Sequence, residues 1–293
     1  MRKIVDFCFI LLITLLGGSV FFAFKYGIEV RVILFSFSII LLMFSLKNKC
    51  NNIVALVVIC LILFLNTFLN VSYGVKITSL IALIIVCISL AIIQDNVSKE
   101  KFMTTYINIM AVLCCISLIC FFLSKFISPY NFPLFKREFI DTNIYSYSIY
   151  YTWGWDALFK GRNAGIYWEP GGFQTYINLA LTFLIFNKAE RKGYFYIMLL
   201  LFIVTIITTS STTGYIVLAI ILAYSFLTNK IKFKSKKEKM RGFIVIGSIV
   251  LTSLYLIVNS NVINDKFGQQ GENSSYSIRK NDSSSTLEII KKY

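Results

Sequence analysis

Histidine is absent from the sequence, and acidic side chains are scarce. The chain has no His, and its 14 Asp and Glu face 29 Lys and Arg. Six of the seven cysteines lie inside apolar runs, where they are typical of small buried side chains and not of a disulfide framework. Without histidine or paired cysteines in a polar loop, the chain lacks the usual ligands of a zinc or haem site. We therefore expect no metal and no other cofactor.

Charged residues of either sign are also few for a chain of this length. They make up 15% of the 293 residues, whereas 57% are hydrophobic, which is the balance of an integral membrane protein. The net charge of +15 could indicate a nucleic-acid partner. Most Lys and Arg, however, stand in short loops between apolar runs, as membrane insertion prefers. We therefore expect no nucleic-acid partner.

Apolar runs of about the length that crosses a bilayer divide the chain. We predict an all-α integral membrane protein with about nine transmembrane helices. Helices 1 to 5 occupy residues 1–127 and helices 6 to 9 occupy 172–259, with the last five predicted runs at 103–127, 172–186, 193–208, 214–228 and 242–258. Between the two sets lies a long loop, 128–171, and after them a polar segment, 260–293.

The distribution of basic residues predicts the orientation of these helices. Lys and Arg gather near the N-terminus and in every second loop, most densely between 230 and 241, so that side is expected to be cytoplasmic. The N-terminus is then cytoplasmic, and both 128–171 and 260–293 lie outside. The second of these segments stops within a polar stretch, and we expect that it is cut short.

The stretch before Pro170 combines charge, aromatic rings and a helix start. Pro170 after Glu169 is typical of a helix N-terminus, because Pro is tolerated at the first helical position and a carboxylate is stabilised beside it. Arg162 at this edge, close to Tyr167 and Trp168, suits an anionic ligand that arrives from the lipid surface. We interpret this stretch as the mouth of a binding site.

These polar residues also have structural interpretations. The planar fork of Arg162 fits a phosphate or pyrophosphate, although contact with lipid headgroups is the usual role of such a residue. Glu169 is a general base for a sugar hydroxyl, or it only caps the helix that begins at Pro170 or pairs with Arg162. Gly171 and Gly172 allow close backbone approach, either to a neighbouring helix or to ligand oxygens.

A row of aromatic residues lies in the long loop. An extended segment would place every second side chain from 145 to 155 on one face, and this set is Tyr145, Tyr147, Ile149, Tyr151, Trp153 and Trp155. Such a row is a platform for the apolar faces of sugars or, with about equal weight, an aromatic belt at the lipid headgroups. The members that we expect to bind substrate are Tyr151, Trp153 and Trp155.

Four further residues in the predicted outer segments are candidates. Arg137 adds a basic group to the long loop. Ser211 and Thr212 stand in a turn of hydroxyl residues that offers hydrogen bonds to a glycan, although helix capping is the safer interpretation. Arg279, in the polar last segment, fits either an anion or an ordinary solvated charge.

Three motifs occur in a recognisable order. Residues 162 to 171 read Arg-Asn-Ala-Gly-Ile-Tyr-Trp-Glu-Pro-Gly, a hydroxyl-rich turn ends at Gly214, and Ser277 stands two residues before Arg279. The first motif looks like the Arg-x-x-Gly-(apolar)-x-x-Glu-Pro-Gly signature of the bacterial O-antigen and capsular-polysaccharide polymerases (Wzy-type). The chain therefore resembles that family and, more broadly, the O-antigen ligase and polymerase superfamily.

This resemblance implies a membrane glycosyltransferase of the GT-C type on the outer face of the bacterial cytoplasmic membrane. Such enzymes join oligosaccharide repeat units carried on undecaprenyl pyrophosphate, without a nucleotide sugar or an obligatory metal. The partners implied are the lipid-linked glycan, membrane lipids, a flippase and a chain-length regulator. Carried onto this chain, the resemblance gives catalytic roles to Arg162 and Arg279, which would hold pyrophosphate, and then to Glu169.

Other functions stay open at this point. Related ligases carry an outer-loop histidine, so its absence here favours a polymerase over a ligase-type glycan transferase. A flippase or transporter for the same lipid-linked glycan is expected to place ionisable residues near the membrane midplane. Here the ionisable residues gather at the predicted outer edge, which favours surface chemistry. A partner-binding membrane subunit is the third alternative.

Overall fold

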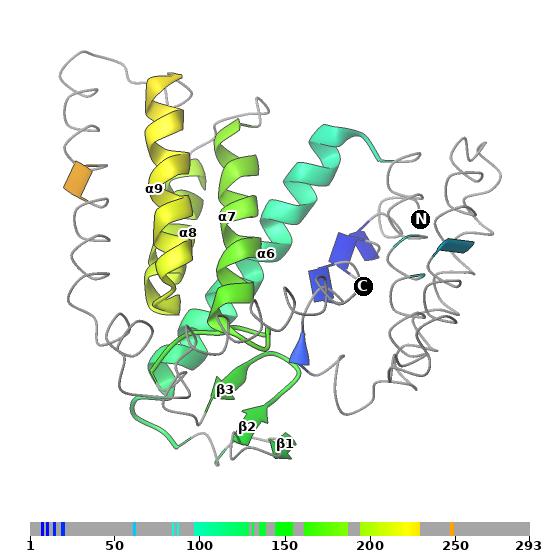
Figure 1. Cartoon of the computed structure of the whole chain (residues 1–293), viewed down its shortest axis with the longest axis vertical. Helices are drawn as coiled ribbons and strands as arrows, with labels where there is room; N and C mark the ends of the chain where they lie inside the picture. Colours follow the sequence, from blue (N-terminus) through cyan, green and yellow to red (C-terminus); the bar gives the residue numbers. More distant parts are fainter. Residues whose placement is uncertain are drawn as a thin grey trace, which may run out of the picture. The chain divides into compact units, whose positions relative to one another are not determined.

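The computed structural model describes residues 97–128, 131, 135–138, 144–154, 161–186, 194–228 and 247–248, with isolated positions 7, 8, 10, 11, 14, 15, 19, 20, 61, 62, 84 and 87. Figure 1 shows the elements in chain order. They are α6 (Lys99–Leu123), β1 (Phe135–Glu138), β2 (Ile144–Tyr147), β3 (Thr152–Gly154), α7 (Pro170–Phe186), α8 (Tyr194–Thr209) and α9 (Thr212–Leu227). One compact unit covers residues 1–214 and a second covers 215–293.

Helix α6 begins at a capped N-terminus and is the longest of the described helices. Ser98 has an extended backbone and its hydroxyl accepts the Lys101 N–H at 3.4 Å, while Glu100 supplies a negative charge in the first turn. The helix has 25 residues, and among the described helices it is the one that is long and apolar enough to cross a membrane. The apolar helices α8 and α9 have 16 residues each.

The described part is mostly helical, and four predicted runs are helices in the structure. Helices α6, α7, α8 and α9 overlap the runs predicted at 103–127, 172–186, 193–208 and 214–228. The predicted run 242–258 lies outside the described residues except at 247–248, and so does the whole of 260–293. The nine transmembrane helices and their orientation stay predictions.

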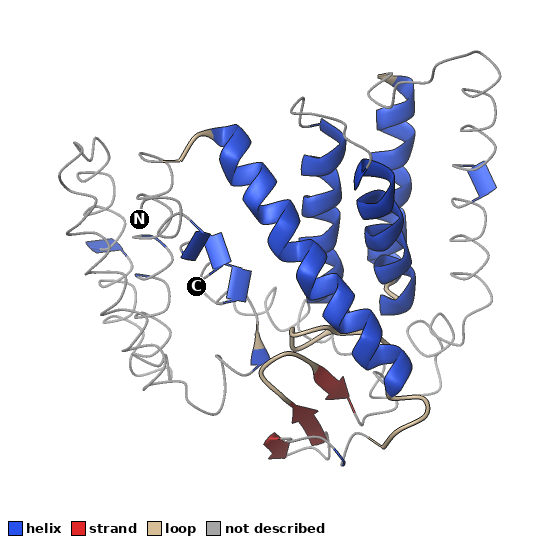
Figure 2. Cartoon of the chain, turned by 180° about the vertical axis from the view of Figure 1, so that it is seen from behind, coloured by secondary structure: helices blue, strands red, loops and turns tan. Residues whose placement is uncertain are grey.

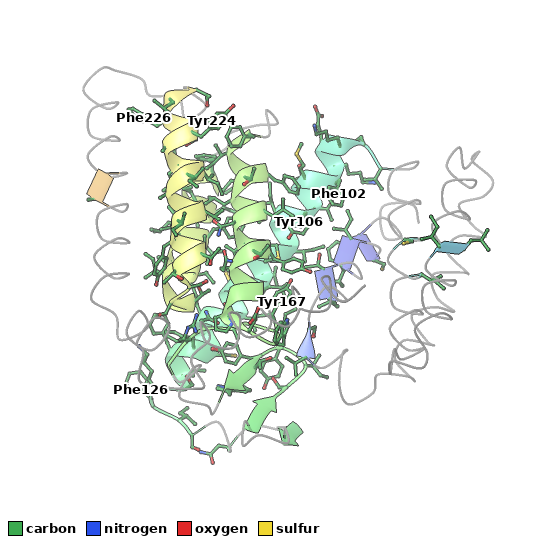
Figure 3. The ribbon with its side chains drawn as sticks, viewed as in Figure 1. Phe102, Tyr106, Phe126, Tyr167, Tyr224 and Phe226 are labelled. Carbon is green, nitrogen blue, oxygen red and sulfur yellow. The ribbon has the colours of Figure 1, made fainter. Side chains whose placement is uncertain are left out.

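Helices α6, α7 and α8 pack against one another within the first unit. Helix α6 crosses the other two obliquely (Figure 2). Its contact with α7 is aromatic, because the rings of Phe102 and Tyr106 lie 6.0 and 5.5 Å from that of Phe183, edge to face. Both α6 residues are labelled in Figure 3. The Tyr106 hydroxyl also donates to the Tyr176 carbonyl at 3.2 Å, which helps to fix α7 against α6.

The predicted outer loop contains a small sheet that an all-α class does not include. Strands β1, β2 and β3 form an antiparallel sheet in that order. Over its described part, 145–154, the row that an extended segment would place on one face is instead a hairpin, in which Tyr147 pairs with Thr152. Its turn is held by Ser148, whose N–H and hydroxyl donate to the Tyr151 carbonyl while the hydroxyl accepts the Tyr151 N–H. A hydroxyl that bonds its own turn is a local signal for chain reversal.

The sheet is attached to the end of α6. Tyr151 and Trp153, at and just after the hairpin turn, pack with Phe121 in one buried cluster. The rings of Tyr151 and Trp153 lie 4.7 Å apart, edge to face. Figure 1 shows the sheet beside the end of α6 and the start of α7. This end of the helices is where the candidate site residues lie.

Candidate functional site

The loop from 161 to 169 is hydrogen-bonded to several separate parts of the chain. Its backbone bonds to β3 through the Thr152 N–H and the Gly165 carbonyl at 2.7 Å. It bonds to the N-terminal segment through the Val20 N–H and the Ile166 carbonyl at 3.1 Å. The Tyr167 hydroxyl donates to the Thr14 carbonyl at 3.2 Å. Separate parts of the first unit therefore converge on this loop.

Two glycines give the loop its path. Gly161 and Gly165 have φ of +74° and +57°, in the region that side chains rarely adopt. A Cβ on Gly165 would lie 2.7 Å from the Phe173 ring, so there is no room for a side chain at this position. Phe173 is fully buried and stacks on Tyr167 with centroids 5.5 Å apart, which leaves its ring little room to move.

Arg162 is half-buried and reaches the C-terminus of α8. Its Nε–H donates to the Thr209 carbonyl at 3.1 Å. A cation here complements the negative end of the helix dipole and satisfies a carbonyl of the last turn. The same contact orients the guanidinium, which has five donors in a planar fork. Arg162 is thus held in place by protein, and its predicted role in binding pyrophosphate stays a prediction.

Asn163 is the residue that sequence analysis missed. It is fully buried and its Nδ2 donates to Ser117 Oγ of α6 at 3.3 Å and to Thr208 Oγ1 of α8 at 3.0 Å. Its Oδ1 accepts the Gly165 N–H at 3.0 Å, and its own N–H donates to the Thr208 carbonyl at 2.9 Å. The bond to Gly165 is an Asx turn, and an Asn two residues before a Gly is the signal that could have revealed it.

The start of α7 lies directly after this loop. Pro170 is its first residue, as the sequence predicts, and the Glu169 carbonyl accepts the Phe173 N–H at 3.2 Å. Glu169 is half-buried and Trp168 is 48% exposed. A Cβ on Gly172 would lie 3.7 Å from Glu169 Cγ and 3.8 Å from Trp168 Nε1, so both side chains lean over the first turn of the helix.

Among the described residues, no helix approaches the Cβ positions of Gly171 and Gly172. Around the Cβ positions of Gly171 and Gly172, the described atoms within 4 Å belong to Trp168 and Glu169. Of the two roles considered for these glycines, close approach to another helix therefore has no support among the described residues. Approach of a ligand to the backbone of the first turn stays a prediction.

Three predicted substrate-binding rings are buried. Tyr151, Trp153 and Tyr167 have 2%, 7% and 0% of their surface exposed. Burial raises the pKa of Tyr151 and of Tyr167, so both phenols stay neutral at physiological pH. Protein covers these rings, which makes Trp168 the most exposed of the described aromatic candidates. The substrate-binding roles of Tyr151, Trp153 and Tyr167 stay predictions.

The turn between α8 and α9 contains the predicted hydroxyl residues. Ser210 has φ of +47° and ends α8, and the buried Ser211 accepts the Gly214 N–H at 3.5 Å at the start of α9. This is the N-cap geometry that the safer interpretation predicts. A Cβ on Gly214 would lie 3.1 Å from Gln174, so the turn sits close against α7. Contact of Ser211 or Thr212 with a glycan stays a prediction.

The remaining candidates lie at or beyond the limits of the described part. Arg137 is in β1, where its backbone pairs with Tyr145. Trp155 and Arg279 lie outside the described residues. Among the residues that the structure describes, no group of three His, Cys, Asp or Glu could hold a metal ion.

Comparisons with known proteins gave no relative. No protein-family model, no curated protein and no solved structure matches the chain. The function must therefore be argued from the residues and from the geometry of the loop that holds Arg162.

Proposed function

We propose that the chain is a polysaccharide polymerase that joins oligosaccharide repeat units carried on undecaprenyl pyrophosphate, at the outer face of the bacterial cytoplasmic membrane. The observation that carries this proposal is the placement of the signature residues. Arg162, Trp168 and Glu169 stand in one hydrogen-bonded loop between the end of α8 and the start of α7. This arrangement puts a cation, an exposed ring and a carboxylate close to the end of apolar helices.

Exposed apolar side chains support a membrane location. They stand on α6 and α8 away from the contacts between the helices, and each has more than two fifths of its surface exposed: Val112, Ile119, Phe122, Tyr196, Ile197 and Leu200. Faces of this kind are costly in water, whereas lipid tails cover them at no cost. The lipid tail of a substrate could lie along such a face while its pyrophosphate reaches the loop.

The proposed reaction is a glycosyl transfer. A hydroxyl oxygen of the acceptor repeat unit attacks the anomeric carbon of the donor glycan, and the bond from that carbon to the pyrophosphate oxygen breaks. Undecaprenyl pyrophosphate leaves with the bonding electrons, and the hydroxyl proton passes to the Glu169 carboxylate or to water. Arg162 would stabilise the charge that develops on the leaving pyrophosphate, and stabilisation of this kind usually lowers the barrier more than any other single effect.

The exposed ring of Trp168 has a matching role. Apolar faces of sugars pack on aromatic rings, and a nearby carboxylate accepts hydrogen bonds from sugar hydroxyls. Trp168 and Glu169 lean over the same turn of α7, next to backbone N–H groups that suit a phosphate oxygen. A sugar held there would have its pyrophosphate near the positive end of the helix.

A lipid-linked glycan flippase is the second candidate, and one observation favours it. Gln174 and Asn178 form a buried amide pair inside α7, with Asn178 Nδ2 donating to Gln174 Oε1 at 2.8 Å. Asn178 Oδ1 has no hydrogen-bond partner among the described residues. Buried polar groups within membrane helices often line transport paths. The pair is uncharged, however, which is less than a charged carrier headgroup needs.

Reconstitution separates the two functions. The purified chain is placed in liposomes with a fluorescent repeat unit on undecaprenyl pyrophosphate, and both product length and transbilayer movement are measured. A polymerase yields products of two or more repeat units and leaves the movement at the rate of empty liposomes. Accelerated movement of unchanged single repeats would contradict the polymerase and support the flippase.

A further inference from the structure

We propose that Asn163 is a positioning residue, which holds the backbone of the loop so that the Arg162 guanidinium is presented from the end of α8. Asn163 would touch neither the lipid-linked glycan nor the reacting atoms. The inference rests on the proposed function only for its measurement of turnover, because the geometry of the loop does not depend on the reaction.

The two adjacent loop residues bind two adjacent carbonyls of α8. The Asn163 N–H donates to the Thr208 carbonyl at 2.9 Å, and the Arg162 Nε–H donates to the Thr209 carbonyl at 3.1 Å. The loop therefore has a defined register along the last turn of the helix. A shift of Asn163 by one residue would move Arg162 away from its carbonyl as well.

The side chain of Asn163 fixes this register from the other side. It bonds to Ser117 on α6 and to Thr208 on α8, so it joins the loop to two helices at once. Ser117 is itself buried and donates to the Cys114 carbonyl at 2.9 Å, so its lone pairs face the Asn163 amide with little freedom to turn. Each polar atom of the Asn163 side chain is thus satisfied inside the protein.

The turn at Gly165 depends on the same side chain. Asn163 Oδ1 accepts the Gly165 N–H, and the Gly165 carbonyl in turn accepts the Thr152 N–H of β3. Loss of the Asn163 amide would therefore release the loop from both helices and loosen its junction with the sheet. Arg162 would then sample other positions, even though its own side chain is unchanged.

Two alanine variants, one at Asn163 and a matched control at Asn178, test this role. Asn163→Ala removes the side-chain hydrogen bonds of Asn163 to Ser117, Thr208 and Gly165. Asn178→Ala is the control, because Asn178 is also buried but bonds to Gln174 and Gly214 and not to the loop. Both changes leave a small buried cavity and free polar groups. A purely structural effect is expected to be similar in the two proteins.

The first readout needs no activity. The full chain in detergent is treated with phenylglyoxal, and modification of Arg162 is followed by mass spectrometry of its peptide. We expect Asn163→Ala to raise the rate about tenfold, because local opening of the loop becomes easier. Asn178→Ala should leave the rate within about twofold of the wild type. An unchanged rate in Asn163→Ala, or an equal rise in both variants, would overturn the proposal.

The second readout is turnover of the lipid-linked repeat unit. Misplacement of a catalytic group by about 1 Å costs roughly 100-fold, so kcat of Asn163→Ala should fall by about that factor while the half-saturating substrate concentration changes little. A kcat equal to that of Asn178→Ala would also overturn the proposal. If the wild type makes no polymer but the labelling rates differ as expected, the positioning of Arg162 stands and the proposed function fails.

Should Asn163→Ala not fold, Thr208→Val carries the same test. It keeps the volume of the side chain and removes one of the acceptors of the Asn163 amide, while the Thr208 carbonyl still accepts the Asn163 N–H. Its labelling rate should lie between those of the wild type and Asn163→Ala. A rate equal to the wild type would contradict the role given to the side chain.

Discussion

Arg162→Ala is expected to lower polymer formation by at least 100-fold while the protein remains folded and in the membrane. Removing one preorganised donor to developing negative charge typically costs a factor of about 100 to 1000 in kcat. The free energy of unfolding should fall by only about 1 kcal/mol, because the lost bond, from half-buried Arg162 to the Thr209 carbonyl, lies at a helix C-terminus. Initial rates with the purified chain, normalised to folded protein, measure the effect.

Two further variants define what Arg162 does. Arg162→Lys keeps the charge but loses the planar fork, so it should recover only part of the rate if two-point contact with pyrophosphate matters. Lys125→Ala is the matched control, because Lys125 lies just after α6 and contacts the rings of Phe121 and Phe122. It should keep the rate within about threefold, since it removes a peripheral charge. A wild-type rate for Arg162→Ala would exclude Arg162 from catalysis.

Gly165→Ala is expected to destabilise the protein by about 2 to 5 kcal/mol. The left-handed backbone at φ +57° costs about 1 to 2 kcal/mol for a residue with a Cβ. Overpacking against the Phe173 ring adds about 1 to 3 kcal/mol, because the new Cβ would lie 2.7 Å from it. Thermal unfolding in detergent, followed by near-ultraviolet circular dichroism, should show a clearly lower midpoint.

Gly161→Ala separates the two causes. Gly161 has a similar φ of +74°, but no atom of the described residues lies within 4 Å of its Cβ position. It should therefore show the backbone cost of about 1 to 2 kcal/mol without the packing cost. Combining Gly165→Ala with Phe173→Leu should recover part of the loss through the relieved contact. Equal effects of the two glycine variants would mean that the ring adapts and that the close packing is not limiting.

Sequence patterns predicted the elements whose causes are local. The start of α7 follows from Pro170 after a carboxylate, and the four overlapping helices follow from apolar runs. The capping role of Ser211 likewise depends on residues two or three positions away. Such features need no knowledge of the tertiary contacts. The number of transmembrane helices and their orientation are predictions of the same kind that the described residues leave untested.

Features that depend on distant contacts could not be predicted. The side-chain amide of Asn163 donates to Ser117 and Thr208, which stand more than forty residues away on either side. No pattern in the sequence around Asn163 predicts those partners. The period of two from 145 to 155 describes which side chains share a face in an extended segment. It does not reveal the turn that the Ser148 hydroxyl closes through its bonds to Tyr151. Burial of Tyr151 and Trp153 depends on α6, so the sequence did not distinguish a covered cluster from an open platform.

The most direct test of the proposed function is a glycan ladder from living cells. Bacteria that lack their own polymerase, but carry the genes for the cognate repeat unit and its flippase, receive this chain, and the surface polysaccharide is separated on a gel. We predict a ladder of many bands with the wild-type chain and a single repeat unit with Arg162→Ala. Only the single repeat unit with the wild-type chain, despite confirmed insertion in the membrane, would contradict the proposed polymerase.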